Sequence, residues 1–162
     1  MTKPRKQLFS LSDTSFYHLV SRCVRREFLC ITDDKTGQDY EHRRVWVADR
    51  IRILSSVFLI EVLSYAVMSN HYHIVVKVDK DTVKPWSDEE VINRWLCIFK
   101  GSPLLQKYHQ GKLLNDAERD VIKRLAKRYR KRLRNLSWFI KILNKSIARK
   151  STMRTIVPAT TI

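Results

Sequence analysis

Short apolar runs alternate along this chain with longer stretches in which apolar residues recur every three or four positions. Residues 16–24 are rich in aromatic and β-branched side chains, which is typical of a strand. Residues 61–68 form a second such run, and a third begins at His71 after the polar pair Ser69-Asn70. Because that pair is short enough for a hairpin turn, the second and third strands are predicted to pair antiparallel.

Helical spacing follows in the rest of the chain. Within residues 45–60 the apolar positions recur at intervals of four, three and four, which predicts a helix. Ser87 and Glu90 have the spacing of a capping box and precede a second periodic run. The Lys-Gly-Ser-Pro sequence at 100–103 is expected to end that helix.

A second capping-box pair, Asn115 with Glu118, predicts the start of the longest helical segment. One apolar stripe runs from Ile122 to Ile147 with four-and-three spacing, and residues 135–137 are a plausible break into two helices. The order of elements predicts an α+β fold, with an antiparallel sheet of the ferredoxin-like split βαβ kind covered by helices. Residues 1–111 are expected to form the sheet domain, 112–150 a basic helical extension on or beside it, and 151–162 a disordered tail.

Charge is the strongest compositional signal, with a formal net charge of +16. Between Lys112 and Arg154 there are 15 basic residues and three acidic ones. This excess favours polyanionic partners, of which nucleic acid is the commonest. No apolar run is long enough to span a bilayer, and three cysteines without C-x-x-C spacing argue against a disulfide framework. We therefore expect a cytoplasmic protein, nucleoid-associated when bound to DNA, with no membrane partner.

Candidate chemistry lies at the start of the third predicted strand. His71 and His73 are two residues apart, so in a strand they share one face, with backbones about 6–7 Å apart. Two imidazoles at that separation can bind one divalent cation. Lys77 belongs to the same face and is a candidate phosphate contact, whereas the even positions from Tyr72 to Val78 are expected to face the core. Ordinary hydrogen bonding of the two histidines is the alternative.

The basic cluster near residue 130 is the second candidate site. Its functional interpretation is a surface that contacts the phosphates of DNA, and the alternative is a solvated helix face. The absence of balancing acids on the same segment favours nucleic-acid contact. The candidate residues are Arg128, Arg130, Lys131, Arg132 and Arg134.

Residues 68–76 resemble the M-P-N-H-x-H-hydrophobic signature of the single-tyrosine HUH transposases, and are most similar to that of the REP-associated tyrosine transposases. Residues 17–22 resemble the first-strand Y-H-V-x-x-R segment of that family, and residues 138–144 resemble its F-M-x-x-L-N helix. The spacing of the segments also fits, and the resemblance covers roughly residues 14–150. Ser69 stands where the family often has proline.

The resemblance implies an HUH palm that cleaves and rejoins single-stranded, hairpin-forming DNA, with His71 and His73 holding Mg²⁺ or Mn²⁺. In the family a tyrosine in a Y-x-x-x-N-P segment attacks the phosphate and becomes linked to the 5′ end. None of the six tyrosines of this chain precedes an Asn-Pro pair. We therefore expect a truncated or frameshifted transposase with impaired activity, in which the catalytic residue stays unknown.

Other possibilities stay open at this stage. His18, on the first predicted strand, is a candidate third metal ligand, although an ordinary core or edge histidine is the favoured interpretation. A non-catalytic nucleic-acid-binding module with an RNA-recognition-like sheet is the alternative function. A metal-dependent nuclease that uses water as its nucleophile is a third. The sequence leaves open whether the chain forms a homodimer.

Overall fold

The computed structural model describes residues 15–22, 41–78 and 86–153. These residues form an α+β fold, as predicted, with three strands and five helices. In chain order the elements are β1 (Phe16–Arg22), α1 (His42–Val57), β2 (Glu61–Val67), β3 (His71–Lys77), α2 (Asp88–Leu96), α3 (Pro103–His109), α4 (Asp116–Leu133) and α5 (Leu136–Met153). Residues 154–162 of the predicted tail lie outside the described residues, while residues 151–153 belong to α5.

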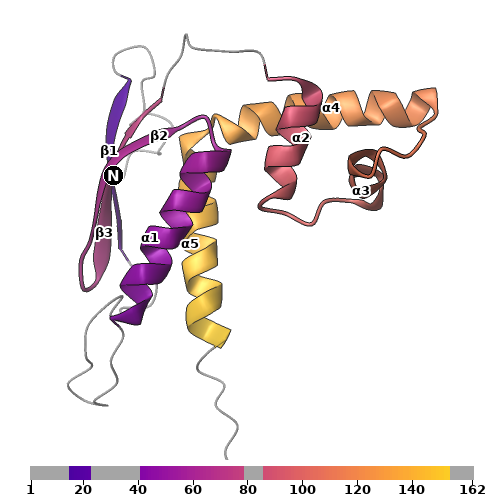
Figure 1. Ribbon diagram of the computed structural model, residues 1–162. Coiled ribbons are helices and arrows are strands. Elements are labelled where there is room, and N and C mark those ends of the chain that lie inside the picture. The colour runs from indigo at the N-terminus through magenta and orange to yellow at the C-terminus, as the bar shows by residue number, and fades with distance from the viewer. Residues whose placement is uncertain (1–14, 23–40, 79–85, 154–162) are drawn as a thin grey trace, which may run out of the picture.

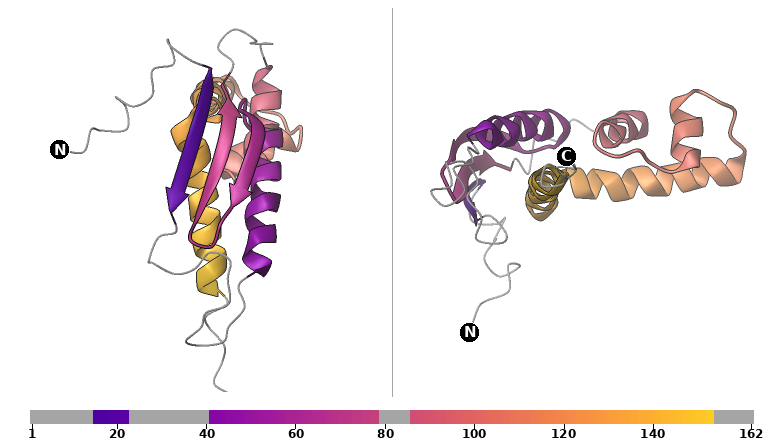
Figure 2. Two further views of the ribbon diagram at one scale, coloured as in Figure 1. Left: turned by 90° about the vertical axis from the view of Figure 1, so that its left-hand side faces the viewer. Right: turned by 90° about the horizontal axis from the view of Figure 1, so that it is seen from below.

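The sheet has the order β1-β3-β2, and β3 runs antiparallel to both neighbours. Strands β1 and β2 are therefore parallel to one another, and α1 connects them while β3 lies between. The predicted hairpin is confirmed, since the backbone N–H of Met68 donates to the carbonyl of His71 over 2.8 Å. Helices α1 and α5 lie side by side behind the sheet, which leaves its other face uncovered by any described element (Figures 1 and 2).

The alternation along β3 explains this one-sided packing. Tyr72, Ile74 and Val76 are at most 2% exposed, and the residues between them are only half-buried. Their buried side chains pack with apolar residues of α1 and α5, including Leu54 and Phe139. Burying an aliphatic or aromatic side chain of this kind contributes about 1.5–3 kcal/mol. The predicted core face of the third strand is confirmed.

Helices α2, α3 and α4 form an arm that extends from the body, by which we mean the sheet with α1 and α5 (Figure 1). Both predicted capping boxes are present, with the side chains of Ser87 and Asn115 accepting the backbone N–H three residues on. Helix α3 was not predicted. It begins with the Ser102 cap and has Pro103 in its first turn, a start signal that had been taken only as the end of α2.

The arm joins the body at an elbow between α4 and α5, where a break was predicted. Trp138 of α5 lies there, with the Arg132 guanidinium 4.3 Å and the Lys141 ammonium 5.2 Å from its ring centroid. The backbone N–H of Leu59, between α1 and β2, donates to the carbonyl of Leu133 at the end of α4 over 2.9 Å. These contacts attach the arm to the body at its base.

Residue 111, the predicted boundary between the sheet domain and the basic extension, lies in the arm. That position falls between α3 and α4, which contact each other, whereas α5 packs with α1 in the body. The segment from residue 112 therefore contributes one helix to each part. None of the helices in the described ranges combines the length and apolarity that crossing a membrane requires.

Candidate functional site

His71 and His73 lie on the uncovered face of the sheet, as the alternation predicted. The cross-strand register places them opposite Arg22 and Val20 of β1. Both histidines are half-buried, their ring centroids are 4.9 Å apart, and their planes make an angle of 69°. We call this surface the open face; it consists of His18, Val20, Arg22, His71, His73, Val75 and Lys77, with Phe16 at its end.

The turn before β3 provides a partner for His71. Asn70 is exposed, and its Oδ1 lies 2.5 Å from Nδ1 of His71. Sequence reasoning had treated Asn70 only as a turn residue. Its position directly before the histidine pair could have indicated a contact with His71, because a short amide side chain can reach the ring of the next residue.

His18 provides the corresponding partner for His73. Its Nε2 lies 2.8 Å from Nδ1 of His73, and the two rings are nearly parallel, with centroids 5.0 Å apart. His18 is exposed on β1, an edge strand of the sheet, so of the two favoured positions, core and edge, it occupies the edge one. Within the described ranges there is no group of three or more His, Cys, Asp and Glu side chains that could hold a metal ion. His18 thus contacts a candidate ligand without completing a three-residue metal cluster.

Beneath the histidines, α5 holds β3 through a polar contact that sequence reasoning missed. Tyr72 lies between the two histidines in sequence and points to the opposite face, where its hydroxyl donates to Oδ1 of Asn144 over 2.6 Å. The Nδ2 of Asn144 donates to the hydroxyl of Ser21 on β1 over 3.1 Å. One side chain of α5 therefore connects the two strands that carry His18, His71 and His73.

Two cations flank the histidines on the open face. Arg22 is exposed and is the register partner of His71. Lys77, a predicted phosphate contact, lies at the other end of β3, and its Nζ is 3.8 Å from a carboxylate oxygen of Glu61. The carboxylate partly compensates the charge of Lys77, so Arg22 is the cation closer in register to the histidine pair. Arg22 was not among the predicted site residues.

The predicted basic cluster divides into two groups. Arg128 and Lys131 are exposed on α4. Arg130 instead donates to a carboxylate oxygen of Asp88 over 2.7 Å and to the carbonyl of Trp86 over 2.9 Å, which fastens α4 to the start of α2. A guanidinium held by two bonds within the fold is poorly placed to contact phosphate as well.

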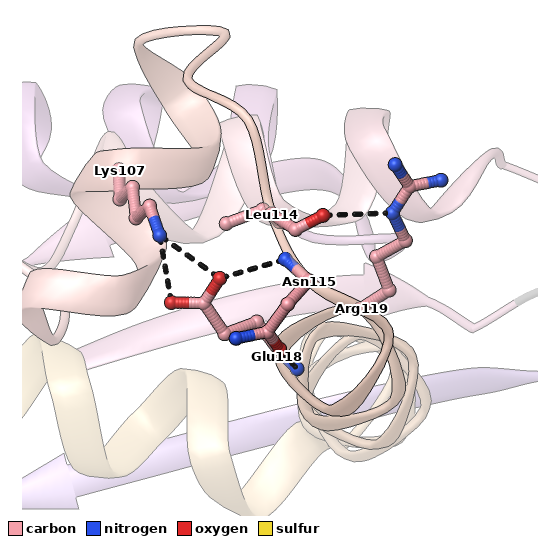
Figure 3. Close-up of polar contacts among 5 residues, drawn as sticks. All are labelled: Lys107, Leu114, Asn115, Glu118 and Arg119. Atoms are coloured by element: carbon pink, nitrogen blue, oxygen red, sulfur yellow. Dashed lines mark hydrogen bonds and ion pairs between the residues drawn. The ribbon is translucent and has the colours of Figure 1, made fainter.

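The other two predicted cations lie at the elbow. Arg132 covers Trp138, and Arg134 is the residue that follows the last turn of α4. Both are half-buried. The side of α4 that faces away from its apolar stripe carries further exposed cations that were not named among the candidates: Lys123, Arg124 and Lys127. Arg119 is also exposed, and its Nε donates to the carbonyl of Leu114 over 3.2 Å, as Figure 3 shows.

The acids of α4 are confined to its first turns, and two of them are paired, Glu118 with Lys107 and Asp120 with Lys123 at 4.0 Å. Figure 3 shows both carboxylate oxygens of Glu118 facing the ammonium of Lys107, at 2.7 and 2.9 Å, and one of them also accepting the backbone N–H of Asn115. These bonds hold the pKa of Glu118 below its ordinary value of 4.5, the bond from Lys107 being the largest cause. The later turns of α4, from Lys123 onward, carry only basic charges, so the positive potential is concentrated near the elbow.

The chain matches no protein-family model, no curated protein and no solved structure.

Proposed function

We propose that this chain is a DNA-processing protein of the single-tyrosine HUH transposase type, with a ferredoxin-like palm that binds single-stranded DNA together with a divalent cation. The observation that carries the proposal is the pair His71 and His73, which lie side by side on an uncovered sheet face with ring centroids 4.9 Å apart. A cationic side chain, Arg22, stands opposite His71 on the neighbouring strand. A phosphate group brought to this face would meet both kinds of group.

The donor set fits a cation that accepts nitrogen ligands. Imidazole suits the later first-row metals, and Mn²⁺ accepts it more readily than Mg²⁺, which prefers oxygen ligands and retains its waters. Among the cations expected from the sequence, Mn²⁺ is therefore the better match. Two histidines leave coordination positions open, which water and a DNA phosphate would fill. When bound, the cation supplies Lewis-acid neutralisation of the phosphate oxygens.

The arm supports the choice of a nucleic acid as partner. Its exposed cations lie four residues apart along one side of α4, as in Lys123, Lys127 and Lys131. Helical residues at this spacing share a face, so the side chains form a row that a phosphate backbone can follow. Arg128 and Lys131 of the predicted DNA contacts belong to this side, and Arg130 is assigned to holding the arm together.

The described tyrosines do not provide an obvious nucleophile. Tyr17, Tyr65 and Tyr72 are register partners of buried residues or are buried themselves, so they belong to the sheet face opposite the histidines. Tyr108 and Tyr129 lie on helices of the arm. Strand cleavage by attack of a tyrosine is therefore not assigned to any of these five residues, and the proposal concerns binding of metal and DNA at the open face.

One observation favours the alternative of a non-catalytic binding module. Phe16 and Val20 are 55% and 54% exposed on β1, on the same face as the histidines. Exposed aromatic and apolar side chains on an uncovered sheet can stack against unpaired bases, as in RNA-recognition folds. This alternative explains the open face without any metal.

The test uses the purified full chain with a hairpin-bearing single-stranded oligonucleotide. Binding is measured by fluorescence anisotropy with Mn²⁺ and with EDTA, and products are resolved on a denaturing gel. Our proposal predicts that Mn²⁺ strengthens binding, and that His71→Ala and His73→Ala each remove the metal-dependent part. His109→Ala, which changes an exposed histidine of the arm, is the matched control and should retain it.

The other outcomes distinguish the alternatives. Binding that is equal in Mn²⁺ and EDTA, and that survives both histidine variants, would refute the metal site and support the binding module. Cleavage without a covalent protein–DNA adduct would indicate water as the nucleophile. A covalent adduct would indicate a tyrosine of this chain, and peptide mapping would identify it.

A further inference from the structure

Each histidine of the candidate pair has its Nδ1 against a neighbouring side chain, and the Nε2 atoms are the ring nitrogens left for a ligand. We infer that Asn70 and His18 are positioning residues, which hold His71 and His73 in the tautomer that carries its proton on Nδ1. This inference rests on the proposed function, because its purpose is to present two Nε2 lone pairs to one cation. It assigns a role to two residues that are not themselves metal ligands.

The contact of Asn70 indicates the tautomer of His71. The atom that faces the ring is Oδ1, an amide oxygen, which only accepts hydrogen bonds. With this oxygen facing the ring, the bond requires Nδ1–H of His71 as its donor. In a neutral imidazole the other nitrogen then carries the lone pair. Nε2 of His71 is therefore the atom available to a cation.

The contact between His18 and His73 allows two arrangements, and only one is compatible with metal binding. If Nε2–H of His18 donates, Nδ1 of His73 is the acceptor and the proton of His73 lies on Nε2, which closes that nitrogen to a cation. If Nδ1–H of His73 donates, its Nε2 is a lone pair. The second arrangement also uses the Nε2 lone pair of His18 as the acceptor, at 2.8 Å. His18 then orients its neighbour and cannot bind the cation through the same atom.

The arrangement is the one that metal-binding histidines commonly show, with the second ring nitrogen donating to a fixed acceptor that sets the tautomer and ring orientation. Loss of such an acceptor typically lowers metal affinity by about 10–100-fold. We expect each of Asn70→Ala and His18→Phe to weaken Mn²⁺ binding by a factor in this range. His18→Phe keeps a flat ring beside His73 and removes only its nitrogens.

The decisive measurement needs no metal. In protein labelled with ¹⁵N, long-range correlation spectra distinguish Nδ1–H from Nε2–H imidazoles at a pH where the rings are neutral. The metal-free wild type should show His71 and His73 as Nδ1–H tautomers. Asn70→Ala should move only His71 towards Nε2–H, and His18→Phe should move only His73.

Conservative variants separate positioning from a general structural effect. Asn70→Asp retains an oxygen acceptor and His18→Gln supplies one in place of the imidazole nitrogen, so both should restore the Nδ1–H signal and most of the Mn²⁺ affinity, measured by electron paramagnetic resonance titration. His109→Phe, an exposed histidine on α3, is the control and should change neither quantity. Circular dichroism on every variant checks that the fold is retained.

Two results would overturn the inference. If the wild-type protein shows either candidate ligand as the Nε2–H tautomer without metal, the proposed orientation is wrong, even if Mn²⁺ still binds. If His18→Phe removes Mn²⁺ binding completely and His18→Gln does not restore it, His18 is a ligand itself. Failure of wild-type protein to bind Mn²⁺ at all would instead refute the proposed function while leaving the tautomer measurement intact.

Discussion

The polar contact of Asn144 beneath the histidine strand offers a quantitative test of the architecture. Asn144 accepts from the Tyr72 hydroxyl at 2.6 Å and donates to the Ser21 hydroxyl at 3.1 Å. The variant Asn144→Ala removes both bonds and leaves the surrounding residues unchanged. Because these bonds connect α5 to β1 and β3, we expect the variant to lower the free energy of unfolding and to shift the strands that carry the histidines.

The magnitude follows from the two bonds. An intramolecular hydrogen bond contributes about 0.5–1.5 kcal/mol net, so loss of both should lower the free energy of unfolding by about 2 kcal/mol. For a chain of this size, that corresponds to a decrease in Tm of about 4–8 °C. Lys145→Ala, at the next and exposed position of α5, is the control and should change stability by less than about 0.5 kcal/mol.

A double-mutant cycle isolates the bond to Tyr72. Urea unfolding is measured for Tyr72→Phe, Asn144→Ala and the double variant, and the coupling energy should be about 1 kcal/mol. Tyr72→Phe removes only the hydroxyl, so the packing of the ring is retained. A coupling energy below about 0.3 kcal/mol would refute the claim that this bond holds the strand. Mn²⁺ titrations on the same variants would show whether the loss extends to the histidine pair.

Three further predictions concern the arm. Arg130→Ala should lower the free energy of unfolding in urea by about 1 kcal/mol, because it removes the bonds to the start of α2. Lys131→Ala should change the free energy of unfolding by less than about 0.5 kcal/mol and should weaken DNA binding in anisotropy titrations. The pKa of Glu118 is lowered in the folded protein, so its ionised side chain stabilises above pH 4.5, and this contribution is lost as pH falls through the folded pKa. The Tm advantage of wild type over Glu118→Gln should therefore be constant at neutral pH and decrease below pH 4.5. Gly101→Ala should lower Tm more than Gly111→Ala, because both have positive φ but only the first places a Cβ 2.7 Å from a leucine methyl group of α2.

Each of these predictions has a contradicting result. Equal stability losses for the two α4 variants would mean that Arg130 does not fasten the arm. A Tm difference for Glu118→Gln that persists unchanged to pH 3 would mean that its pKa is not lowered. Equal losses at the two glycines would show that the leucine side chain moves aside freely.

The secondary structure was largely predictable because its signals are local. The capping boxes at Ser87 and Asn115 marked two helix starts, and the alternation after His71 gave the buried and open faces of β3. Helix α3 was missed because Ser102 and Pro103 were taken only as an end signal, although the same two residues can begin a helix.

The partners of the candidate site residues were not predictable in this way. The contact between His18 and His73 depends on the register of β1 against β3, which lie far apart in sequence, and local patterns do not set that register. Arg130 was grouped with its exposed neighbours because helical periodicity does not reveal that Asp88 of α2 packs beside it. Long-range packing therefore decided which charged residues are available to a ligand.

The elbow between α4 and α5 makes the molecule sensitive to helical phase. A residue inserted in the last turn of α4 would turn the preceding 18-residue helix by roughly 100° about its axis and advance it by about 1.5 Å. The contact between the Arg132 side chain and Trp138 would be lost, and the row of lysines would point in a different direction relative to the histidines. An insertion of this kind keeps every charged residue of the chain and changes only how the row of lysines is oriented and placed relative to the histidines. The length of the chain at this point, as much as its composition, therefore fixes how the two surfaces are aligned.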